Sequence, residues 1–500
     1  MGIFKRFLDT VEWLGNKLPH PFMIFVYLAI IAIGLSWLAS LFGAAVEDPG
    51  SGEMVAVENM ISGAGLEFIL TSMIDNFVEF PPLGIILGVM LGIGLAQKAG
   101  LIETAMQKAI SSAPRSLVTY VVILTGVLGN LASDAAYVVV PPLAALAFLS
   151  VGRHPLAGMA AGFAAVGAGF TANFIVAGTD ALLSGISTEA ARIVDAEAAV
   201  TPVDNYYFMA FSVLMLVIVG GLVTERIVEP RLGEYRGSSS DRELEETTPQ
   251  ENRGLRNAAI AAAVYLGAIV AATIPANSPL RGEEGGLVPS TLLDGIVPII
   301  LFFFVIVAVT YGITAGTVRN VGDVPRLMGE AMKDMSTVIV LIFAAAQFIA
   351  YFEFSNLGIW VAVNGAEFLE SVQFTGLPVI IAFILLVTLL NLLITSGSAQ
   401  WALMAPIFVP LFTLLDFDPA LTQLAFRIGD SSTNIITPTS PYVAMMLAFM
   451  REYDEEAGFG TLLSMMLPYT LLFLGSWILI FIAWYLIGIP IGPGVSSQPG

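Results

Sequence analysis

The chain has 500 residues, of which 57% are apolar and 12% are charged, and its mean hydropathy is +0.85. Soluble domains are less apolar than this, so the composition predicts a polytopic membrane protein. Cysteine is absent, which excludes disulfides, thiolate chemistry and cysteine metal sites. The formal net charge of −20 argues against a nucleic acid partner.

Apolar runs long enough to cross a lipid bilayer follow one another along the whole chain. A helix that crosses about 30 Å of hydrocarbon needs roughly 20 apolar residues. This criterion predicts about nine transmembrane helices, at 21–43, 79–98, 155–180, 206–228, 255–274, 296–317, 336–355, 420–450 and 461–488.

The sign of the charged residues alternates between successive connections of these helices. Basic residues occupy alternate connections and acidic residues occupy the others, with departures at Arg192 and Arg281. The positive-inside rule assigns the basic connections to the cytoplasm. We therefore expect a cytoplasmic N-terminus, which carries Lys5, Arg6 and Lys17, and an odd number of crossings then places the C-terminus on the opposite side.

Two further apolar stretches, 116–150 and 377–415, are split near their centres by polar residues. Their ends must return to one side for the charge pattern to hold, so both are predicted to be re-entrant hairpins. The first, flanked by Arg115 and Arg153, enters from the cytoplasm, and the second enters from outside. This opposite entry indicates an inverted repeat.

The predicted fold class is an all-α polytopic membrane protein, with about nine transmembrane helices plus two re-entrant hairpins in two inverted repeats. Residues 1–233 form the first half, with a broken helix at 155–180. Residues 255–500 form the second half, with a broken helix at 420–450. Residues 234–254 are rich in Ser, Thr, Arg and Glu and offer no apolar face, which predicts a solvated cytoplasmic linker.

The polar residues that interrupt the two hairpins follow similar sequence patterns. Ser133 in the first hairpin and Ser398 in the second each precede a proline by the same number of residues, and a second pair of breaks follows at Asn173 and Asn434. Irregular backbone at membrane depth must lie inside protein or around a cavity. Breaks at corresponding positions of two halves therefore indicate the midplane substrate site of a secondary transporter.

Oxygen donors at these breaks, together with the carbonyl groups of unwound backbone, suit a sodium ion. The alternative is that Asn and Ser residues at hairpin tips only cap helix ends. The candidate sodium ligands are Asn130, Ser133, Asp134, Asn173, Asn391, Ser396, Asp430 and Asn434. A proton is the other candidate coupling ion, and no organic cofactor is expected.

Four ionisable residues cannot avoid the membrane, namely Asp134, Asp180, Arg427 and Asp430. Arg427 and Asp430 are three residues apart, so they can share a helix face and pair. In the alternative interpretation Arg427 anchors a substrate carboxylate, because its guanidinium group matches a carboxylate in two places. Trp401 either stacks on an aromatic substrate or is an ordinary core residue.

Three segments resemble the p-aminobenzoyl-glutamate transporter (AbgT) family of the ion transporter superfamily: 391–410, 426–438 and 133–138. The resemblance extends over nearly the whole chain. It implies a homodimer in the bacterial inner membrane, with the N-terminus cytoplasmic and the C-terminus periplasmic. The substrate path of the family corresponds here to Asp180, Ser398, Trp401, Pro419, Arg427, Asp430 and Pro438.

The function that the resemblance implies is secondary active transport by ion-coupled alternating access. The implied cargo is p-aminobenzoyl-glutamate or a related compound of the folate pathway, imported by some family members, while others export sulfonamide antimetabolites. Both cargoes offer an aromatic ring, and the first also offers carboxylates.

The sequence bears on three other functions. A sodium-coupled dicarboxylate carrier belongs to the same superfamily and is the main alternative. A channel needs a continuous polar pore, whereas the polar residues here cluster near one depth. An intramembrane protease lacks a base, since His20 and His154 are expected at the cytoplasmic edge, far from Ser398. The sequence has no zinc-protease or phosphate-loop signature, so no enzyme is expected.

Overall fold

The computed structural model describes residues 19–48, 52–132, 134–235, 246–282, 285–438 and 440–499. Helices make up nearly all of the secondary structure, which confirms the predicted helical class. The exception is a two-stranded antiparallel ribbon, β1 (Ala45–Glu47) and β2 (Met54–Ala56). Ser133, the basic residues before residue 19 and residues 236–245 of the predicted linker lie outside the described residues. The prediction of a linker up to residue 254 is wrong at its end, because a helix begins at Pro249 behind a capping box of Thr248 and Glu251.

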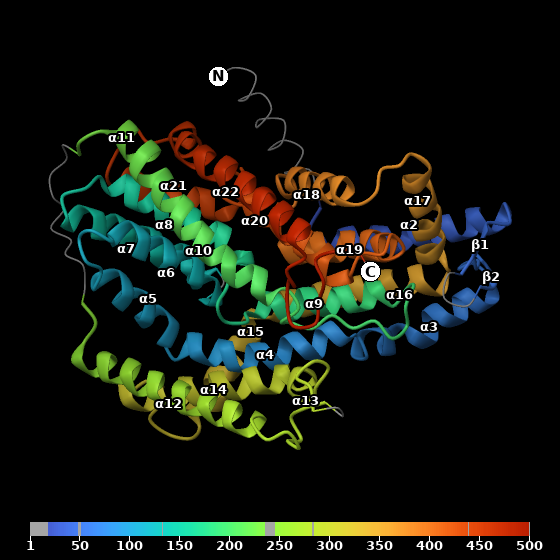
Figure 1. Cartoon of the computed structure of the whole chain (residues 1–500), viewed down its shortest axis with the longest axis horizontal. Helices are drawn as coiled ribbons and strands as arrows, with labels where there is room; N and C mark the ends of the chain where they lie inside the picture. The colour runs from blue at the N-terminus through green and yellow to red at the C-terminus, as the bar shows by residue number, and fades with distance from the viewer. Residues whose placement is uncertain are drawn as a thin grey trace.

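Seven helices of the described residues are long and apolar enough to cross a membrane. They are α2 (Pro21–Leu41), α3 with α4 (Gly63–Val78 and Pro81–Lys98), α10 with α11 (Tyr206–Val223 and Glu229–Leu232), α12 (Pro249–Thr273), α14 (Ile296–Ala315), α16 (Ser336–Phe354) and α22 (Phe459–Ile487). Each overlaps one of the predicted crossings. In Figure 1, α12 and α14 lie side by side along one edge of the molecule.

One of these helices starts earlier than the sequence indicates. The apolar run predicted at 79–98 is preceded by α3, so that the continuous span is Gly63–Lys98. Glu67, Asp75 and Asn76 interrupt the apolar residues of α3, and the hydropathy criterion therefore misses it. The helix is capped by Ser62, whose hydroxyl accepts a hydrogen bond from the Gly65 backbone N–H.

The two broken helices are interrupted at the predicted polar segments. The first consists of α8 (Pro155–Ala168) and α9 (Gly178–Ala191), so it ends beyond the predicted residue 180. The second consists of α20 (Pro419–Thr433) and α21 (Pro441–Arg451). Proline occupies the first turn of α8, α20 and α21, where its missing N–H is tolerated.

Each predicted hairpin is a pair of helices joined by a short irregular segment. The first pair is α6 (Val118–Leu128) and α7 (Ala135–Ser150), joined through a 3₁₀ turn at Gly129–Ala132. The second pair is α18 (Leu377–Asn391) and α19 (Gly397–Thr413). Both α6 and α7 pack on α8, while α18 packs on α20 and α19 packs on α9 (Figure 1).

Glycine makes the closest of these helix contacts possible. At Gly429 of α20, a Cβ atom would lie 2.6 Å from the Val387 Cβ and 2.7 Å from the Ile384 carbonyl oxygen of α18. At Gly126 of α6, a Cβ atom would lie 2.6 Å from the Ala165 Cβ of α8. Small residues at helix interfaces let two backbones approach in membrane proteins.

Four shorter helices complete the fold: α5 (Leu101–Ser111), α13 (Thr291–Asp294), α15 (Asp323–Asp334) and α17 (Leu357–Ser371). The mixed Lys, Gln and Glu of 101–112, with apolar residues spaced by three and four, predict a surface helix where α5 lies. The sequence gives no prediction for the other three. An ion pair of 2.6 Å between the Lys98 amino group and the Asp334 carboxylate joins α4 to α15.

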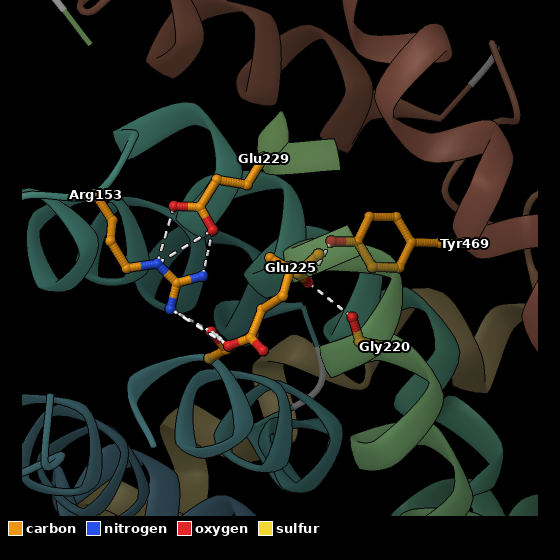
Figure 2. Close-up of polar contacts among 7 residues, drawn as sticks. Arg153, Gly220, Glu225, Glu229 and Tyr469 are labelled. Atoms are coloured by element: carbon orange, nitrogen blue, oxygen red, sulfur yellow. Dashed lines mark hydrogen bonds and ion pairs between the residues drawn. The ribbon is translucent and has the colours of Figure 1, made fainter. Parts of the chain in front are cut away.

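A polar network fixes the open ends of α6 and α7 to α10 and α11 (Figure 2). Arg153 follows α7, and its guanidinium group donates to the Thr119 hydroxyl at 2.7 Å and pairs with both Glu225 and Glu229. Glu225 lies in a π-helical turn, Thr224–Val228, between α10 and α11. Glu225 and Glu229 are four residues apart, so both carboxylates reach one guanidinium group and anchor the first hairpin at its base.

Candidate functional site

The four polar breaks of the sequence meet at one cavity of about 380 Å³. The first hairpin contributes Asp134, and the second contributes 395–398. The first broken helix contributes Phe170 and 178–179, and the second contributes Asn434 and other residues near its break. Small-molecule sites typically have volumes of about 300–1,000 Å³. Segments far apart in the sequence therefore build one space large enough for a small substrate.

The charged groups that line this cavity are acidic. Asp134 and Asp430 contribute carboxylates, and no basic side chain of the described residues is among the lining residues. Asp134 is exposed, whereas Asp430 is 5% exposed. The cavity is therefore an unfavourable place for an anion unless a cation or a proton accompanies it.

Arg427 lies behind the cavity and forms an ion pair with Asp180. The two side chains come from α20 and α9 and are 1% and 2% exposed. Asp180 also accepts a hydrogen bond of 2.6 Å from the Ala177 backbone N–H. The pairing of Arg427 with Asp430, which their helical spacing indicated, is replaced by this long-range ion pair, because Asp180 approaches from the neighbouring helix.

Arg427 retains unused donors. Its Nε and Nη1 atoms are buried without a hydrogen-bond partner among the described residues. A buried polar group without a partner costs free energy, so each such group calls for an explanation. Arg427 therefore keeps part of its capacity to bind a carboxylate.

Trp401 is fully buried and does not line the cavity. Its indole N–H points at the Leu183 carbonyl oxygen at 3.2 Å and at the Ser187 hydroxyl at 3.1 Å. Its ring packs against Phe426, with 4.6 Å between the ring centroids. In this conformation Trp401 connects α19 to α9 and α20 and has no face open to a substrate, which agrees with the core alternative.

The hydrogen bonds around Trp401 continue through buried side chains. The Ser187 hydroxyl donates to the Gln423 side-chain oxygen at 2.6 Å, and the Gln423 amide donates to the Asn205 side-chain oxygen at 2.8 Å. The Asn205 amide donates in turn to the Ala420 carbonyl oxygen at 2.8 Å. This chain of bonds ties α9 to α20 below the cavity.

The remaining residues of the predicted substrate path divide between two environments. Ser398 lines the cavity, at the start of α19. Pro419 begins α20 beside its cap Asp418, and Pro438 lies in the break between α20 and α21. Neither proline lines the cavity, so the structure gives both an architectural position.

The first set of candidate cation ligands contains two buried amides. Asn130 and Asn173 are each 2% exposed, and the nitrogen and oxygen atoms of both side chains lack hydrogen-bond partners among the described residues. They lie in the 3₁₀ turn of the first hairpin and in the break of the first broken helix, two segments that contact each other. Two amide oxygens are thus available in a buried place.

The second set lies at the corresponding breaks of the other half. The Asn391 side-chain nitrogen donates to the Thr433 hydroxyl at 3.0 Å and to the Asn434 side-chain oxygen at 2.8 Å. The side-chain oxygen of Asn391 and one carboxylate oxygen of Asp430 have no hydrogen-bond partner among the described residues. Ser396 caps α19 by accepting from the Ala399 N–H at 3.4 Å, so the capping alternative holds for this residue.

Four aromatic residues line the cavity that the sequence did not single out as site residues: Tyr137, Phe170, Phe426 and Tyr442. Aromatic residues inside apolar runs are usually core residues, so composition does not distinguish them. The sequence positions of two of them are nevertheless a signal, because Tyr137 follows Asp134 by three residues and Tyr442 lies in the first turn of α21, after the second break.

Comparison with known proteins matches nearly the whole chain to a single family. Residues 6–498 match the AbgT putative transporter family. The p-aminobenzoyl-glutamate transport protein of Escherichia coli (strain K12) is 46% identical over 486 residues, which are 97% of this chain and 96% of the relative.

Two solved structures share the fold. The Alcanivorax borkumensis YdaH transporter, described as having an unusual topology, matches with a TM-score of 0.89 and 36% identity over 95% of this chain and 100% of its own. Neisseria gonorrhoeae MtrF, described as illuminating a class of antimetabolite efflux pumps, matches with a TM-score of 0.92 and 41% identity over 98% of this chain and 100% of its own. The chain is a multi-pass membrane protein and not an enzyme, and it belongs to the AbgT transporter family.

Proposed function

We propose that this chain carries p-aminobenzoyl-glutamate or a related compound of the folate pathway, and sulfonamide antimetabolites, across the bacterial inner membrane by ion-coupled alternating access. The observation that carries the proposal is the cavity at which the polar breaks of both halves meet. The named cargo of the Escherichia coli relative and the description of MtrF support the choice of substrate.

The proposed membrane topology has nine crossings and two re-entrant hairpins in a homodimer. The seven long helices supply seven crossings, and the broken helices α8–α9 and α20–α21 supply the other two. The hairpins α6–α7 and α18–α19 enter from opposite sides in the two inverted halves, 1–233 and 255–500. The N-terminus is then cytoplasmic and the C-terminus periplasmic, as the positive-inside rule requires.

Charge gives a physical reason for ion coupling. The cargo p-aminobenzoyl-glutamate carries carboxylates, and the cavity already holds those of Asp134 and Asp430. Two like charges about 4 Å apart repel by about 4 kcal/mol at an effective dielectric constant of about 20. A cation or a proton that binds with the substrate removes this repulsion, and the cargo and the ion then bind cooperatively.

The unpartnered oxygen atoms near the breaks support two sodium sites. Asn130 and Asn173 offer amide oxygens at the first, while Asn391 and Asp430 offer an amide and a carboxylate oxygen at the second. Sodium takes hard oxygen ligands, which unwound backbone at helix breaks also supplies. A proton on Asp430 is the alternative coupling ion, since it would neutralise the same carboxylate.

In this cycle Arg427 has a second role besides its ion pair with Asp180. Asp180 occupies one side of the guanidinium group, and the Nε and Nη1 donors are free to bind a second carboxylate. We propose that a glutamate carboxylate of the cargo reaches these donors when α20 moves relative to α9. Asp180 holds the guanidinium group in place until then.

Transport into proteoliposomes tests the proposed function. Uptake of labelled p-aminobenzoyl-glutamate should rise under an imposed sodium gradient or an imposed proton gradient, and Arg427→Ala and Asp430→Ala should each abolish it. Arg326→Ala is the matched control, because Arg326 is an exposed arginine of α15. Full flux through Arg427→Ala and Asp430→Ala would refute the roles of these residues, and a preference for succinate over p-aminobenzoyl-glutamate would support the dicarboxylate alternative.

A further inference from the structure

Three of the aromatic residues that line the cavity, Tyr137, Phe170 and Tyr442, form a continuous stack. The rings of Tyr137 and Tyr442 are parallel within 8°, with 4.2 Å between their centroids. Tyr137 is 3% exposed and is also packed against Phe163 at 5.4 Å and against Phe170 at 6.2 Å. Tyr137 therefore supports one face of Tyr442 from behind, while Tyr442 is half-buried and lines the cavity.

A carboxylate lies beside this stack. Asp134 lines the same cavity as Tyr442 and is close enough to interact with the Tyr442 hydroxyl. Asp134 precedes α7 but makes no capping hydrogen bond to that helix, and its side chain is exposed where it lines the cavity. A carboxylate can accept about four hydrogen bonds. Asp134 thus has acceptor sites left for a donor that enters the cavity.

The combination of a flat ring and an adjacent carboxylate matches one chemical group. An aromatic amine has a ring that can stack on a tyrosine, and its neutral amino group donates hydrogen bonds. Both p-aminobenzoyl-glutamate and the sulfonamides contain a 4-aminophenyl group, although they differ in the rest of the molecule. A carboxylate of the cargo could not lie beside Asp134, since the two charges would repel.

Resting on the proposed function, we propose that Tyr442 and Asp134 form a subsite for the 4-aminophenyl group of the cargo. The ring stacks on Tyr442, which Tyr137 and Phe170 hold in position. The amino group donates to Asp134. This subsite orients the glutamate part away from Asp134, and it allows one cavity to accept both a dicarboxylate and a sulfonamide.

A series of three competitors tests each part of the subsite. The reconstituted protein takes up labelled p-aminobenzoyl-glutamate in the presence of unlabelled p-aminobenzoyl-glutamate, benzoyl-glutamate, which lacks the amine, or N-acetyl-glutamate, which also lacks the ring. The wild-type protein should bind the three with decreasing affinity. Tyr442→Leu should lower the preference for benzoyl-glutamate over N-acetyl-glutamate by about tenfold, whereas Tyr442→Phe should keep it.

Asp134→Asn tests the amine separately. It should lower the preference for p-aminobenzoyl-glutamate over benzoyl-glutamate by about tenfold, since an amide replaces the charged acceptor. If Asp134 binds sodium instead, this variant should change the sodium dependence and leave the preference for the amine intact, which would overturn the subsite. Tyr207→Leu is the matched control, because Tyr207 is an exposed tyrosine of α10 outside the cavity.

The outcomes separate the subsite from the proposed function. If the wild-type protein binds none of the three compounds, the proposed function fails and the subsite fails with it. If the wild-type protein transports p-aminobenzoyl-glutamate but Tyr442→Leu and Asp134→Asn keep its ligand preferences, the subsite alone is wrong. Should Tyr442→Leu fail to fold, Asp134→Asn still decides, because the amide preserves the side-chain shape.

Discussion

At the scale of single residues, breaking the buried ion pair of Arg427 and Asp180 should lower the free energy of unfolding the most. A sequence shows which charges must lie in a membrane, and it identified both residues. It does not show their partners, because helical spacing reports only neighbours on one helix. Asp180 lies 247 residues before Arg427, and only the packing of α9 on α20 brings the two together.

Asp180→Asn should destabilise the protein by about 3–5 kcal/mol, since it leaves the guanidinium group of Arg427 buried without a counter-charge. The amide keeps the size of the side chain and can still accept from the Ala177 N–H. Thermal unfolding of the purified protein in detergent measures the loss. The double variant Asp180→Asn with Arg427→Gln should recover part of it, and additive losses from the two substitutions would contradict the ion pair.

Asp204 lies outside the membrane-spanning helices and should make the free energy of unfolding depend on pH. Burial raises the pKa of its carboxyl group from 3.8 to about 6, although hydrogen bonds from Thr201 lower it, and the charge of Asp418 raises it further. The folded state therefore holds this proton more tightly than the unfolded state. The stabilisation is complete below about pH 4 and is lost as the pH rises through about 6.

Asp204→Asn should flatten this dependence. The wild-type protein should lose about 1–3 kcal/mol of stability between pH 4 and pH 7 through this group, and the variant should not. Unfolding temperatures of both proteins across this pH range provide the measurement. An identical pH profile in the variant would show that Asp204 is not the titrating group.

At the scale of elements, the long helices were predictable and the broken ones only in part. Uniform apolar runs indicate a helix wherever they are long enough, and each of the seven long helices overlaps a predicted run. The polar residues of α3 conceal it from the same criterion. The sequence located the breaks of α8–α9 and α20–α21, but the first broken helix continues beyond its predicted end because polar residues, among them Ser187 and Glu189, interrupt the apolar residues of α9.

Gly429 tests the contact between the second hairpin and its broken helix. Gly429→Ala places a Cβ atom 2.6 Å from Val387, so α18 must move away from α20, and we expect a loss of about 1–3 kcal/mol. Gly475→Ala in α22 is the matched control, because nothing lies within 4 Å of its added Cβ atom. Thermal unfolding compares the two variants, and equal stability would refute the tight contact.

At the scale of the whole molecule, the cavity follows from the arrangement of two halves that are not neighbours in sequence. The repeated polar breaks indicated that such a site exists, and the resemblance to a family supplied candidate residues in and around it. Neither could distinguish the residues that line the cavity, such as Ser398 and Asp430, from those that lie behind it, such as Trp401 and Arg427. That distinction depends on side-chain direction at helix contacts, which spacing alone does not determine.

The central claim is that the breaks of both halves face one substrate cavity, and site-directed labelling tests it most directly. The chain has no cysteine, so single cysteines can be placed at Thr179 in the first half and at Thr395 in the second, both of which line the cavity. We predict that a membrane-impermeant thiol reagent labels both positions from the same side and that p-aminobenzoyl-glutamate protects both. Labelling from opposite sides, without protection by the substrate, would contradict the shared cavity and the carrier mechanism built on it.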